Sequence, residues 1–328
     1  MLGFYAPDCA FGSLSFEHGG SLVCRGGPLD PVVFAWYNTF QEQSSTNWSG
    51  FGGVEMLGYS GSYMSLVDCS FTRFFRLAGD AFVIGLGDCG WSGEFRFRDC
   101  EFYAPRALNL GASYDLTVRL TNCLFQRGVM SACVGPLSVT ARNNLFYGGD
   151  ISFENYGETA SDISLCFTDS LFYSNNITFG TTNLILTNGY NGYMTNCDLL
   201  TNGTSLGGDV ILTNFQFQTG ALGPFYYSTD LPLIDAASYT NAGDAGFFWY
   251  TTTANNVPEG TNRLDIGYHY IALTNGAPID TDGDGIPSYL EDSNGNGVVD
   301  SGETDWQSAT DPGLRVWISD PKNNSNLP

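Results

Sequence analysis

Two acidic loops near the C-terminus carry the clearest chemistry in this 328-residue sequence. The first has side-chain oxygens at loop positions 1, 3, 5 and 12 and glycine at position 6, and the second repeats this template directly after it. Such spacing is typical of calcium loops, in which a position-7 carbonyl and a bidentate glutamate complete the ligand shell. The sequence therefore predicts two Ca²⁺ sites, with ligands Asp280, Asp282, Asp284, Ile286, Glu291, Asp292, Asn294, Asn296, Val298, Asp300 and Glu303.

The arrangement of the two loops differs from that of an ordinary EF-hand pair. They abut without room for a helix between them, and Pro287 lies inside the first. The segment resembles thrombospondin type-3 repeats or the duplicated loops of dockerins, and this resemblance implies that calcium holds an acidic strand in a fixed path. Without the ion, repulsion between the carboxylates is expected to unfold both loops. The alternative is a flexible acidic linker.

A short strand pattern follows the loops at Leu314–Ile318. A single strand has no pairing partner within its own segment. We expect it to return to the preceding domain, to belong to a following domain, or to add to a neighbouring subunit.

The part of the chain that must position these loops carries an irregular internal repeat. Two apolar residues spaced by two precede an Asp or Asn, which is followed by a small anchor residue and, two further on, a large apolar residue. The intervals between anchors run from 18 to 31 residues, too irregular for leucine-rich repeats. The predicted anchors are Cys9, Thr39, Cys69, Cys100, Cys123, Asn144, Ser170, Cys197 and Phe215.

Coiling of the chain around one axis explains the repeat. Alternation with period two places the apolar residues on an inner face, and Asp or Asn tolerates the left-handed backbone of a sharp turn. Stacked coils then place like residues over like, and Phe71, Phe102 and Phe125 are predicted to lie over one another. The pattern resembles the right-handed parallel β-helix, or pectate-lyase-like, superfamily over about residues 1–223. A β-sandwich with coincidental motifs is the alternative fold.

A second resemblance covers the chain after the coils. Leu233–Ala236 and Leu264–Tyr270 are similar to the tail of many bacterial β-helix domains, where an "IDAG" element precedes "DIGAYEY". Together with the aromatic run Phe247–Tyr250, this segment is expected to cap the last coil. The predicted protein is all-β: a right-handed parallel β-helix of about nine coils over residues 1–223, a cap over 224–270, and calcium loops with a terminal strand over 271–328.

Composition and charge limit the partners and the compartment. The net charge of −22 repels nucleic acid, and no apolar run reaches the length of a membrane helix, so neither nucleic-acid binding nor membrane insertion is predicted. Acidity, a single lysine, the calcium-type loops and four glycosylation sequons fit an extracellular or cell-surface protein. No signal peptide opens the sequence, so we expect that one was removed or that the chain is a mature fragment.

The nine cysteines cannot all pair within one chain. Cys69, Cys100 and Cys123 are predicted to stack inside the coils as small apolar residues. Disulfides between adjacent coils are geometrically demanding. No CxxC pair or Cys/His cluster predicts a zinc site.

Enzyme chemistry is weakly supported by the sequence. Pectate-lyase-like and polygalacturonase-like sites need clustered carboxylates with basic residues or histidine, whereas the predicted outward ladder is mainly threonine and contains no acidic cluster. The chain has only two histidines, His18 and His269, although Glu154, Glu158 and Asp162 could meet in loops. Enzymatic activity therefore stays uncertain, and the residues favour a protein without it.

Four arginines are predicted to form a basic stripe on one face, namely Arg96, Arg98, Arg119 and Arg142. The stripe would bind an anionic glycan or a neighbour's calcium segment, unless local pairing with Glu94, Asp99 or Glu101 neutralises it. Because the chain starts inside a coil, an open coil end predicts end-to-end association with copies of itself. The expected function is thus that of an extracellular structural or adhesive protein, such as a fibre or surface layer. The alternative is a polysaccharide-binding or polysaccharide-degrading protein.

Overall fold

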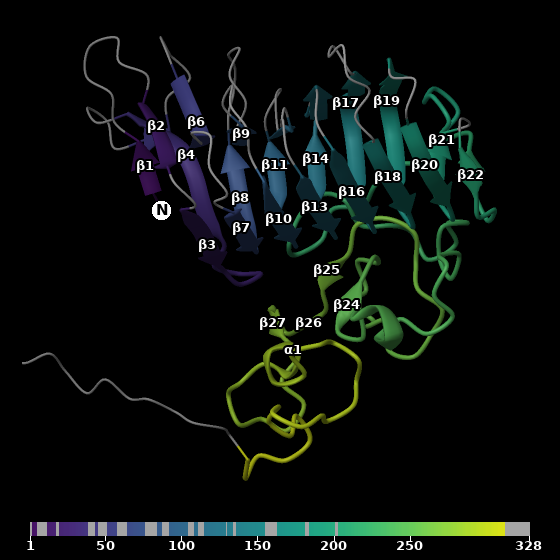
Figure 1. Cartoon of the computed structure of the whole chain (residues 1–328). Coiled ribbons are helices and arrows are strands. Elements are labelled where there is room, and N and C mark those ends of the chain that lie inside the picture. The colour runs from purple at the N-terminus through teal and green to yellow at the C-terminus, as the bar shows by residue number, and fades with distance from the viewer. Residues whose placement is uncertain are drawn as a thin grey trace, which may run out of the picture.

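The chain forms a parallel β-helix with its C-terminal segments lying along one side of the cylinder (Figure 1). In this computed structural model, each strand of the cylinder pairs in parallel with strands one coil before and one coil after it. The fold class predicted from the repeat is confirmed. The structure describes residues 2–4, 12–17, 20–38, 43–44, 51–57, 64–75, 84–86, 92–103, 108–110, 115–128, 130–133, 136–154, 163–180, 184–200 and 203–311.

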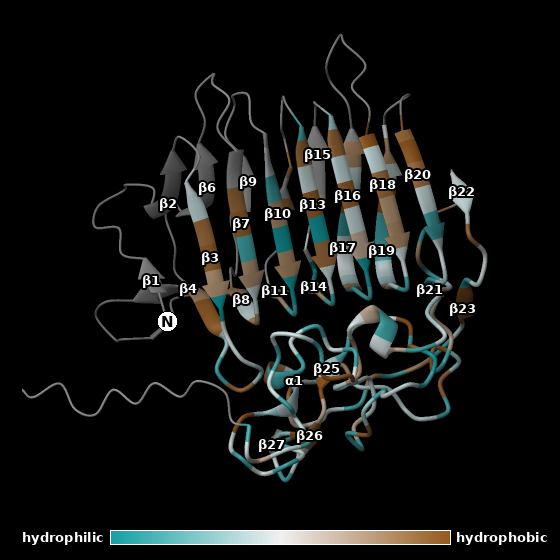
Figure 2. Ribbon diagram, turned by 60° about the horizontal axis from the view of Figure 1, so that its bottom comes forward, coloured by the Kyte–Doolittle hydropathy of each residue, from teal (hydrophilic) through white to brown (hydrophobic). Residues whose placement is uncertain are grey.

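One wall of the cylinder is an eight-stranded parallel sheet. Its inward and outward residues alternate, and apolar and polar colours alternate along β10, β13 and β16 in Figure 2. In order, its strands are β3 (Ser21–Arg25), β7 (Met64–Ser70), β10 (Ser92–Arg98), β13 (Leu116–Thr121), β16 (Leu137–Arg142), β18 (Ile163–Thr168), β20 (Leu184–Gly189) and β22 (Thr204–Ser205).

The other two walls belong to one fifteen-stranded sheet. One wall contains β1 (Leu2–Phe4), β4 (Val32–Asn38), β8 (Thr72–Phe75), β11 (Glu101–Tyr103), β14 (Leu124–Gln126), β21 (Gly192–Met194) and β23 (Val210–Leu212). The next contains β2 (Gly12–Glu17), β6 (Phe51–Leu57), β9 (Ile84–Leu86), β12 (Leu108–Asn109) and β15 (Met130–Cys133). The long strands β17 (Leu145–Glu154) and β19 (Leu171–Phe179) run through both walls, while β5 (Gln43–Ser44) pairs antiparallel with β4.

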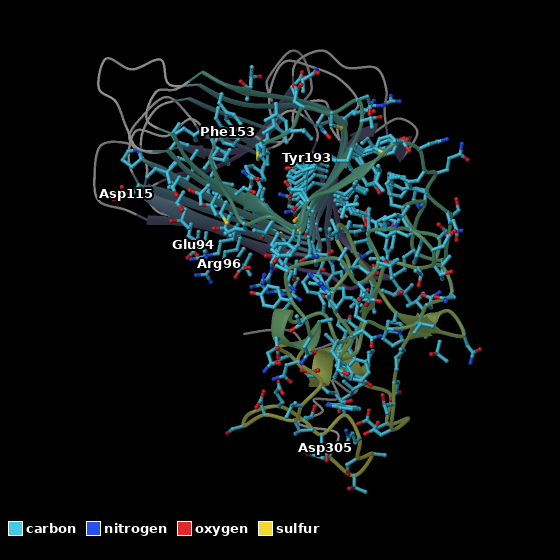
Figure 3. The ribbon with its side chains drawn as sticks, turned by 90° about the vertical axis from the view of Figure 1, so that its right-hand side faces the viewer. Glu94, Arg96, Asp115, Phe153, Tyr193 and Asp305 are labelled. Carbon is cyan, nitrogen blue, oxygen red and sulfur yellow. The ribbon has the colours of Figure 1, made fainter. Side chains whose placement is uncertain are left out.

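A column of stacked aromatic rings fills the interior. Consecutive ring centroids lie 4.7 to 5.1 Å apart, with their planes within 13° of parallel. Looking along the stack from its last coil, Figure 3 places Phe153 and Tyr193 inside the cylinder and Glu94 and Arg96 outside it. Buried rings each remove a large apolar area from water, so this column is a main source of stability. Its members are Phe34, Phe74, Phe102, Phe125, Phe146, Phe172 and Tyr193.

The predicted register holds over residues 92–172 and was wrong in the described coils with the predicted anchors Thr39, Cys69, Cys197 and Phe215. Phe102 and Phe125 stack as expected, but Phe74 rather than Phe71 lies over Phe102. Phe71 instead occupies the turn, with φ at 44°, and Tyr190 occupies the same turn five coils later, with φ at 55°. Because these two turns lack the expected Asp or Asn, the sequence pattern indicated a turn at the nearby pairs Asp68–Cys69 and Asn196–Cys197 instead.

Three of the predicted cysteine anchors are interior residues, whereas Cys197 is only partly buried. Cys69, Cys100 and Cys123 are each at most 1% exposed, and none of the three forms a disulfide. Cys100 and Cys123 occupy equivalent places in neighbouring coils, whereas Cys69 pairs in register with Cys24. The ladder of three is therefore two separate pairs.

The cap segment covers the side of the cylinder rather than its end. It contains a short 3₁₀ helix, η1 (Gly243–Ala245), and the antiparallel pair β24 (Tyr250–Thr251) and β25 (Tyr270–Ile271). Its apolar residues pack on outward-facing Leu124, Leu145 and Leu171, forming a second hydrophobic core. At the end of the stack, Ile211 continues the inner column beyond Tyr193 yet is 52% exposed. The described residues thus leave the last rung open, contrary to the expectation of an end cap.

Turn residues of the coils hold the cap by hydrogen bonds. The Asn122 side chain donates to the carbonyl of His269 at 2.8 Å and accepts from its backbone N–H at 2.7 Å. One coil later, the Asn143 amide donates to the carbonyl of Asp265 at 3.0 Å. In these two neighbouring coils, the left-handed turn thus presents an asparagine side chain to the cap backbone.

Together with Asn122 and Asn143, the acidic turn residues Asp99 and Asp169 form a turn ladder along the successive coils. The hydroxyl of Tyr250 donates to Asp99 at 2.9 Å, and Asp99 also accepts from Asn122 at 2.6 Å. Asp169 accepts from the backbone and hydroxyl of Ser238 at 2.6 and 2.8 Å. Because all these groups are buried or partly buried, leaving any of them unpaired would be costly. The turn ladder therefore fixes the position of the cap on the cylinder.

Candidate calcium-binding segment

The acidic loops lie beyond the cap, after the hairpin β26 (Leu273–Thr274) and β27 (Ala277–Pro278), and contain the one-turn helix α1 (Ser288–Glu291). In the first loop, Asp280 accepts hydrogen bonds from the N–H groups of Gly283 at 2.8 Å and Gly285 at 3.0 Å. Both glycines have positive φ, at 77° and 94°, which a loop wrapped this tightly requires. The sequence thus folds locally into a cradle around the Asp280 carboxylate.

Three carboxylates converge in this cradle. One oxygen from each of Asp280, Asp282 and Asp284 lies within 4.8 Å of the others. Oδ2 of Asp282 is buried and has no hydrogen-bond partner. Three negative charges at this separation repel one another, and oxygen ligands of this kind suit a hard cation such as Ca²⁺.

Helix α1 returns the fourth carboxylate of the first loop toward this cluster. Glu291 is 2% exposed, and neither of its carboxylate oxygens accepts a hydrogen bond of standard geometry. Burial, together with the charges of Asp282, Asp284 and Asp280, raises the pKa of Glu291. A buried carboxylate facing other carboxylates is stabilised when a cation shares the site. Ser288, which binds Thr281 at 2.9 Å, ties the helix to the start of the loop.

The second loop has the same backbone but a different interior. Asp292 accepts from the N–H groups of Asn296 at 3.0 Å and Gly297 at 2.7 Å, repeating the cradle of the first loop. Here the side-chain amides of Asn294 and Asn296 donate to Asp300 at 2.7 and 2.8 Å. These hydrogen bonds lower the pKa of Asp300. In the second loop, side-chain amides therefore donate to one of the loop's own carboxylates. The first loop has aspartates at the equivalent positions and lacks such donors.

The remaining predicted ligands keep their places in the template. Ile286 and Val298 follow the second left-handed glycine of each loop, and their N–H groups bind the position-5 side chains at 2.7 Å. Glu303 closes the second loop, accepting from the hydroxyl of Ser293 at 2.8 Å and from the N–H of Asp300 at 3.1 Å. The structure thus brings each predicted set together as a separate loop.

Aromatic residues of the cap anchor the second loop, and their role was not predicted from the sequence. The indole N–H of Trp249 donates to Asp292 at 2.8 Å, and the N–H of Phe248 donates to the carbonyl of Gly295 at 3.0 Å. Trp306, just after the loops, packs edge-on against Trp249 with ring centroids 4.9 Å apart. The run Phe247–Tyr250 was expected only to supply apolar area, and nothing in its spacing shows the indole facing a loop carboxylate.

The predicted arginine stripe divides into two pairs. Arg96 and Arg119 both pair with Glu94, and their side chains are 49% and 57% exposed. Arg98 donates to the carbonyl of Gly246 at 2.7 Å, and Arg142 to the hydroxyl of Tyr239 at 2.9 Å. Half of the stripe is therefore used to hold the cap, and local pairing accounts for the other half.

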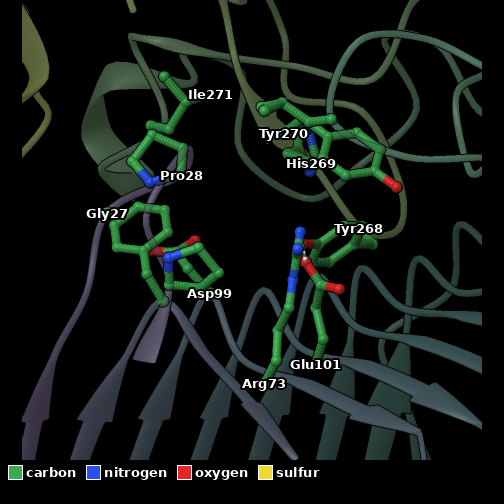
Figure 4. A pocket seen from close by; sticks show the side chains of 12 residues that line it. Gly27, Pro28, Arg73, Asp99, Glu101, Tyr268, His269, Tyr270 and Ile271 are labelled. Carbon is green, nitrogen blue, oxygen red and sulfur yellow. Dashed lines mark hydrogen bonds and ion pairs between the residues drawn. The ribbon is translucent and has the colours of Figure 1, made fainter. Parts of the chain in front are cut away.

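A small pocket between the cylinder, residues 27–31 and the cap shows how the interior charges are arranged (Figure 4). Arg73 forms an ion pair with Glu101 at 3.0 Å, and Glu101 also accepts from the hydroxyl of Tyr103. Asp99, in the turn after β10, binds Asn122 and Tyr250. The charged groups of this pocket are thus committed to structural contacts. Glu158 and Asp162, two of the loop carboxylates considered for catalysis, lie outside the described residues, as does the strand predicted at Leu314–Ile318.

Comparison with models of protein families, with curated proteins and with solved structures finds no match to this chain. Among the residues that the structure describes, no helix is long and apolar enough to cross a bilayer.

Proposed function

We propose that this chain is an extracellular structural or adhesive protein in which two Ca²⁺ ions fix the path of the segment beyond the β-helix. The observation that carries the proposal is the first loop. Asp280, Asp282 and Asp284 converge there, and the buried carboxylate of Glu291 faces their charges without a hydrogen bond of standard geometry. A cation converts this repulsion into attraction, so folding of the segment and ion binding are coupled.

Anchoring of the loops gives the ions a mechanical role. Asp292 belongs to the second loop and also binds Trp249 of the cap, and the neighbouring Tyr250 binds Asp99 of the turn ladder. Helix α1 touches the cylinder directly, because the rings of Tyr289 and Phe71 lie 6.0 Å apart. Calcium in these loops would therefore join the C-terminal segment to the β-helix as one rigid body, which suits a protein that carries load or presents a surface.

Calorimetric titration with Ca²⁺ tests this proposal. The intact chain is expected to bind two ions, and the double variant Asp282→Asn/Glu291→Gln is expected to bind one. Asp230→Asn, which removes an exposed cap carboxylate outside both loops, is the matched control and should still bind two. Absence of Ca²⁺ binding, or equal binding by the loop variant and the control, would refute the calcium sites.

Self-association through the open end of the stack is the second part of the proposal. The edge strands β22 and β23 pair on one side only, so their outer N–H and C=O groups can accept another strand. Ile211 at the end of the inner column and the nearby Leu206 are about half exposed, at 52% and 50%. A second copy stacked on this end would bury both, continuing the column of the first.

The mass of the protein in solution, measured by light scattering with Ca²⁺ present, tests this association. The wild type is expected to form dimers or longer chains, and Leu206→Glu/Ile211→Glu to be monomeric, because charges would enter the apolar contact. Val257→Glu, at an equally exposed apolar cap position, should behave as the wild type. A wild type that stays monomeric at high concentration would rule out this surface as an interface.

Polysaccharide binding is a second candidate, supported by the outer face of the eight-stranded sheet. Arg96 and Arg119 share one carboxylate, Glu94, which leaves one excess positive charge on an otherwise acidic protein. Guanidinium groups recognise the carboxylates of acidic sugars. Binding of an acidic glycan that is lost in Arg96→Gln/Arg119→Gln would support this function, and an array without any bound glycan would remove it. Release of reducing sugar or of an unsaturated uronate would reveal an enzyme instead.

A further inference from the structure

The cap contains a buried cluster that neither the calcium loops nor the coil repeat explains. Glu259, Asp265 and His269 each offer one ligand atom, and these atoms lie within 4.8 Å of one another. The three residues are 7%, 4% and 1% exposed. All three lie between residues 259 and 269 of the cap, so a shared ligand would fix the local path of this stretch.

The histidine is oriented as a metal ligand would be. Its Nδ1 lies 2.9 Å from the carbonyl of Gly267, an acceptor, so this nitrogen carries the proton. Its Nε2 is then an unprotonated lone pair, buried, without a hydrogen-bond partner, and 3.4 Å from an oxygen of Glu259. A ligating histidine commonly donates its other N–H to a backbone carbonyl in this way, which fixes the ring.

The carboxylates are supported in a similar manner. Asp265 accepts from the backbone N–H of Asp235 at 2.7 Å and from the hydroxyl of Thr252. Each of its oxygens retains a lone pair that can face a cation. These contacts place Asp265 before any ion arrives, which is what outer contacts of a metal site do.

The charge of the cluster calls for two positive charges. Two ionised carboxylates beside a neutral imidazole would leave a buried charge of −2, which is strongly unfavourable in an apolar interior. One divalent cation beside the neutral imidazole would balance both carboxylates.

We propose that Glu259, Asp265 and His269 bind one divalent transition-metal ion, best matched by Zn²⁺, as a structural site inside the cap. One nitrogen and two carboxylate ligands suit Zn²⁺, whereas Ca²⁺ prefers six or more oxygens. A second oxygen of Glu259 would complete a four-coordinate sphere. Since His269 and Asp265 also bind the turn residues Asn122 and Asn143 through their backbones, the ion would stabilise the docked cap as well.

Metal analysis of the native protein, purified without chelators, tests the site together with histidine NMR. The protein should contain one tightly held Zn²⁺ after free metal is removed, and one of its two histidine rings should show a metal-bound nitrogen. His269→Gln should hold about tenfold less Zn²⁺, or less still, and should lose that signal. Asp244→Asn, an exposed cap carboxylate, is the control and should retain both.

Glu259→Gln distinguishes a bound metal ion from a metal-free cluster whose carboxyl groups are protonated. It keeps the shape of the side chain and mimics a protonated carboxyl group, so it should fold. If Zn²⁺ is bound, this variant loses the metal and unfolds at lower temperature than the wild type. A wild type that refolds without zinc to the same melting temperature, together with a fully stable Glu259→Gln, would overturn the proposal. The calcium loops lack nitrogen ligands, so this outcome is separate from that of the calcium titration.

Discussion

The β-helix and the C-terminal segment are stabilised by different kinds of interaction. In the coils, seven aromatic rings stack at 4.7 to 5.1 Å, and main-chain hydrogen bonds continue from coil to coil. In the loops, short stretches of backbone wrap around carboxylates, and much of the packing comes from Trp249 and Trp306. The first region needs only its own apolar area, whereas the second combines like charges and is expected to need an ion.

The two loops repeat this contrast on a smaller scale. In the second, Asn294 and Asn296 donate to Asp300, so part of the negative charge already has a partner. In the first, Asp282 and Glu291 have buried oxygens without hydrogen bonds. We therefore expect the first loop to depend more strongly on calcium than the second.

The largest effect is expected from the inner column. Phe125→Ala removes a ring between Phe102 and Phe146 and should destabilise the protein by about 3–5 kcal/mol, the cost of an aromatic truncation in a core. Chemical denaturation should give the same loss with calcium and with chelator. Phe75→Ala removes an exposed ring stacked on Tyr103 and should cost only about 1 kcal/mol. A calcium-dependent loss for Phe125→Ala would contradict the separation of the two regions.

The next effect concerns the turn ladder. Asn122→Gly keeps the left-handed turn but removes the side chain that binds Asp99 and His269. The expected cost is about 1–3 kcal/mol, because buried partners lose their hydrogen bonds. Hydrogen exchange should show faster opening of the cap, with little change in β13 and β16. Equal loss of protection in cap and coils would mean that the cap is not a separately docked unit.

A smaller effect is expected where the second loop meets the cap. Trp249→Phe removes the donor to Asp292 and should cost about 1.5 kcal/mol, measured as weaker calcium binding at the second loop. Trp306→Phe is the matched control, because the indole nitrogen of Trp306 has no hydrogen-bond partner. If both variants bind calcium alike, the contact between Trp249 and Asp292 does not support the loop.

The smallest effect lies on the outer face of the sheet. Hydrogen bonds from Arg96 and Arg119 lower the pKa of Glu94 to about 2. The stability from these pairs is therefore present above pH 4.5, the ordinary value for Glu, and is lost as the pH falls through 2. Since the pairs are largely exposed, Glu94→Gln should not shift the denaturation midpoint measurably. An NMR titration that finds Glu94 near its ordinary pKa would show that the pairs do not persist in solution.

Much of the fold follows from residue pattern alone. Alternating apolar residues, Asp or Asn turns and recurring phenylalanines predict stacked coils, and residues 92–172 have the predicted register. Errors occur where Phe71 and Tyr190 adopt the left-handed turn, because tertiary packing there overrides the usual residue preference. In the coil that contains Phe71, the ring in the inner column is therefore Phe74.

Long-range packing limits what the sequence predicts about sites. Loop spacing is local, and the backbone does wrap around Asp280 and Asp292 in the two segments it indicated, while the calcium sites themselves stay a prediction. The contact of Trp249 with Asp292 joins residues 43 positions apart, and Glu259, Asp265 and His269 meet only through the fold of the cap. No pattern marks such groups in advance. The same holds for Arg98 and Arg142, which bind the cap although their spacing indicated a free stripe.

Hydrogen exchange of the whole chain, measured with calcium and with excess chelator, tests the central claim most directly. We predict that calcium slows exchange strongly at residues 280–303, while strands β10, β13 and β16 exchange equally slowly in both conditions. Loops that are equally protected in chelator would contradict a calcium-dependent segment. A similar change throughout the coils would contradict the independence of the β-helix.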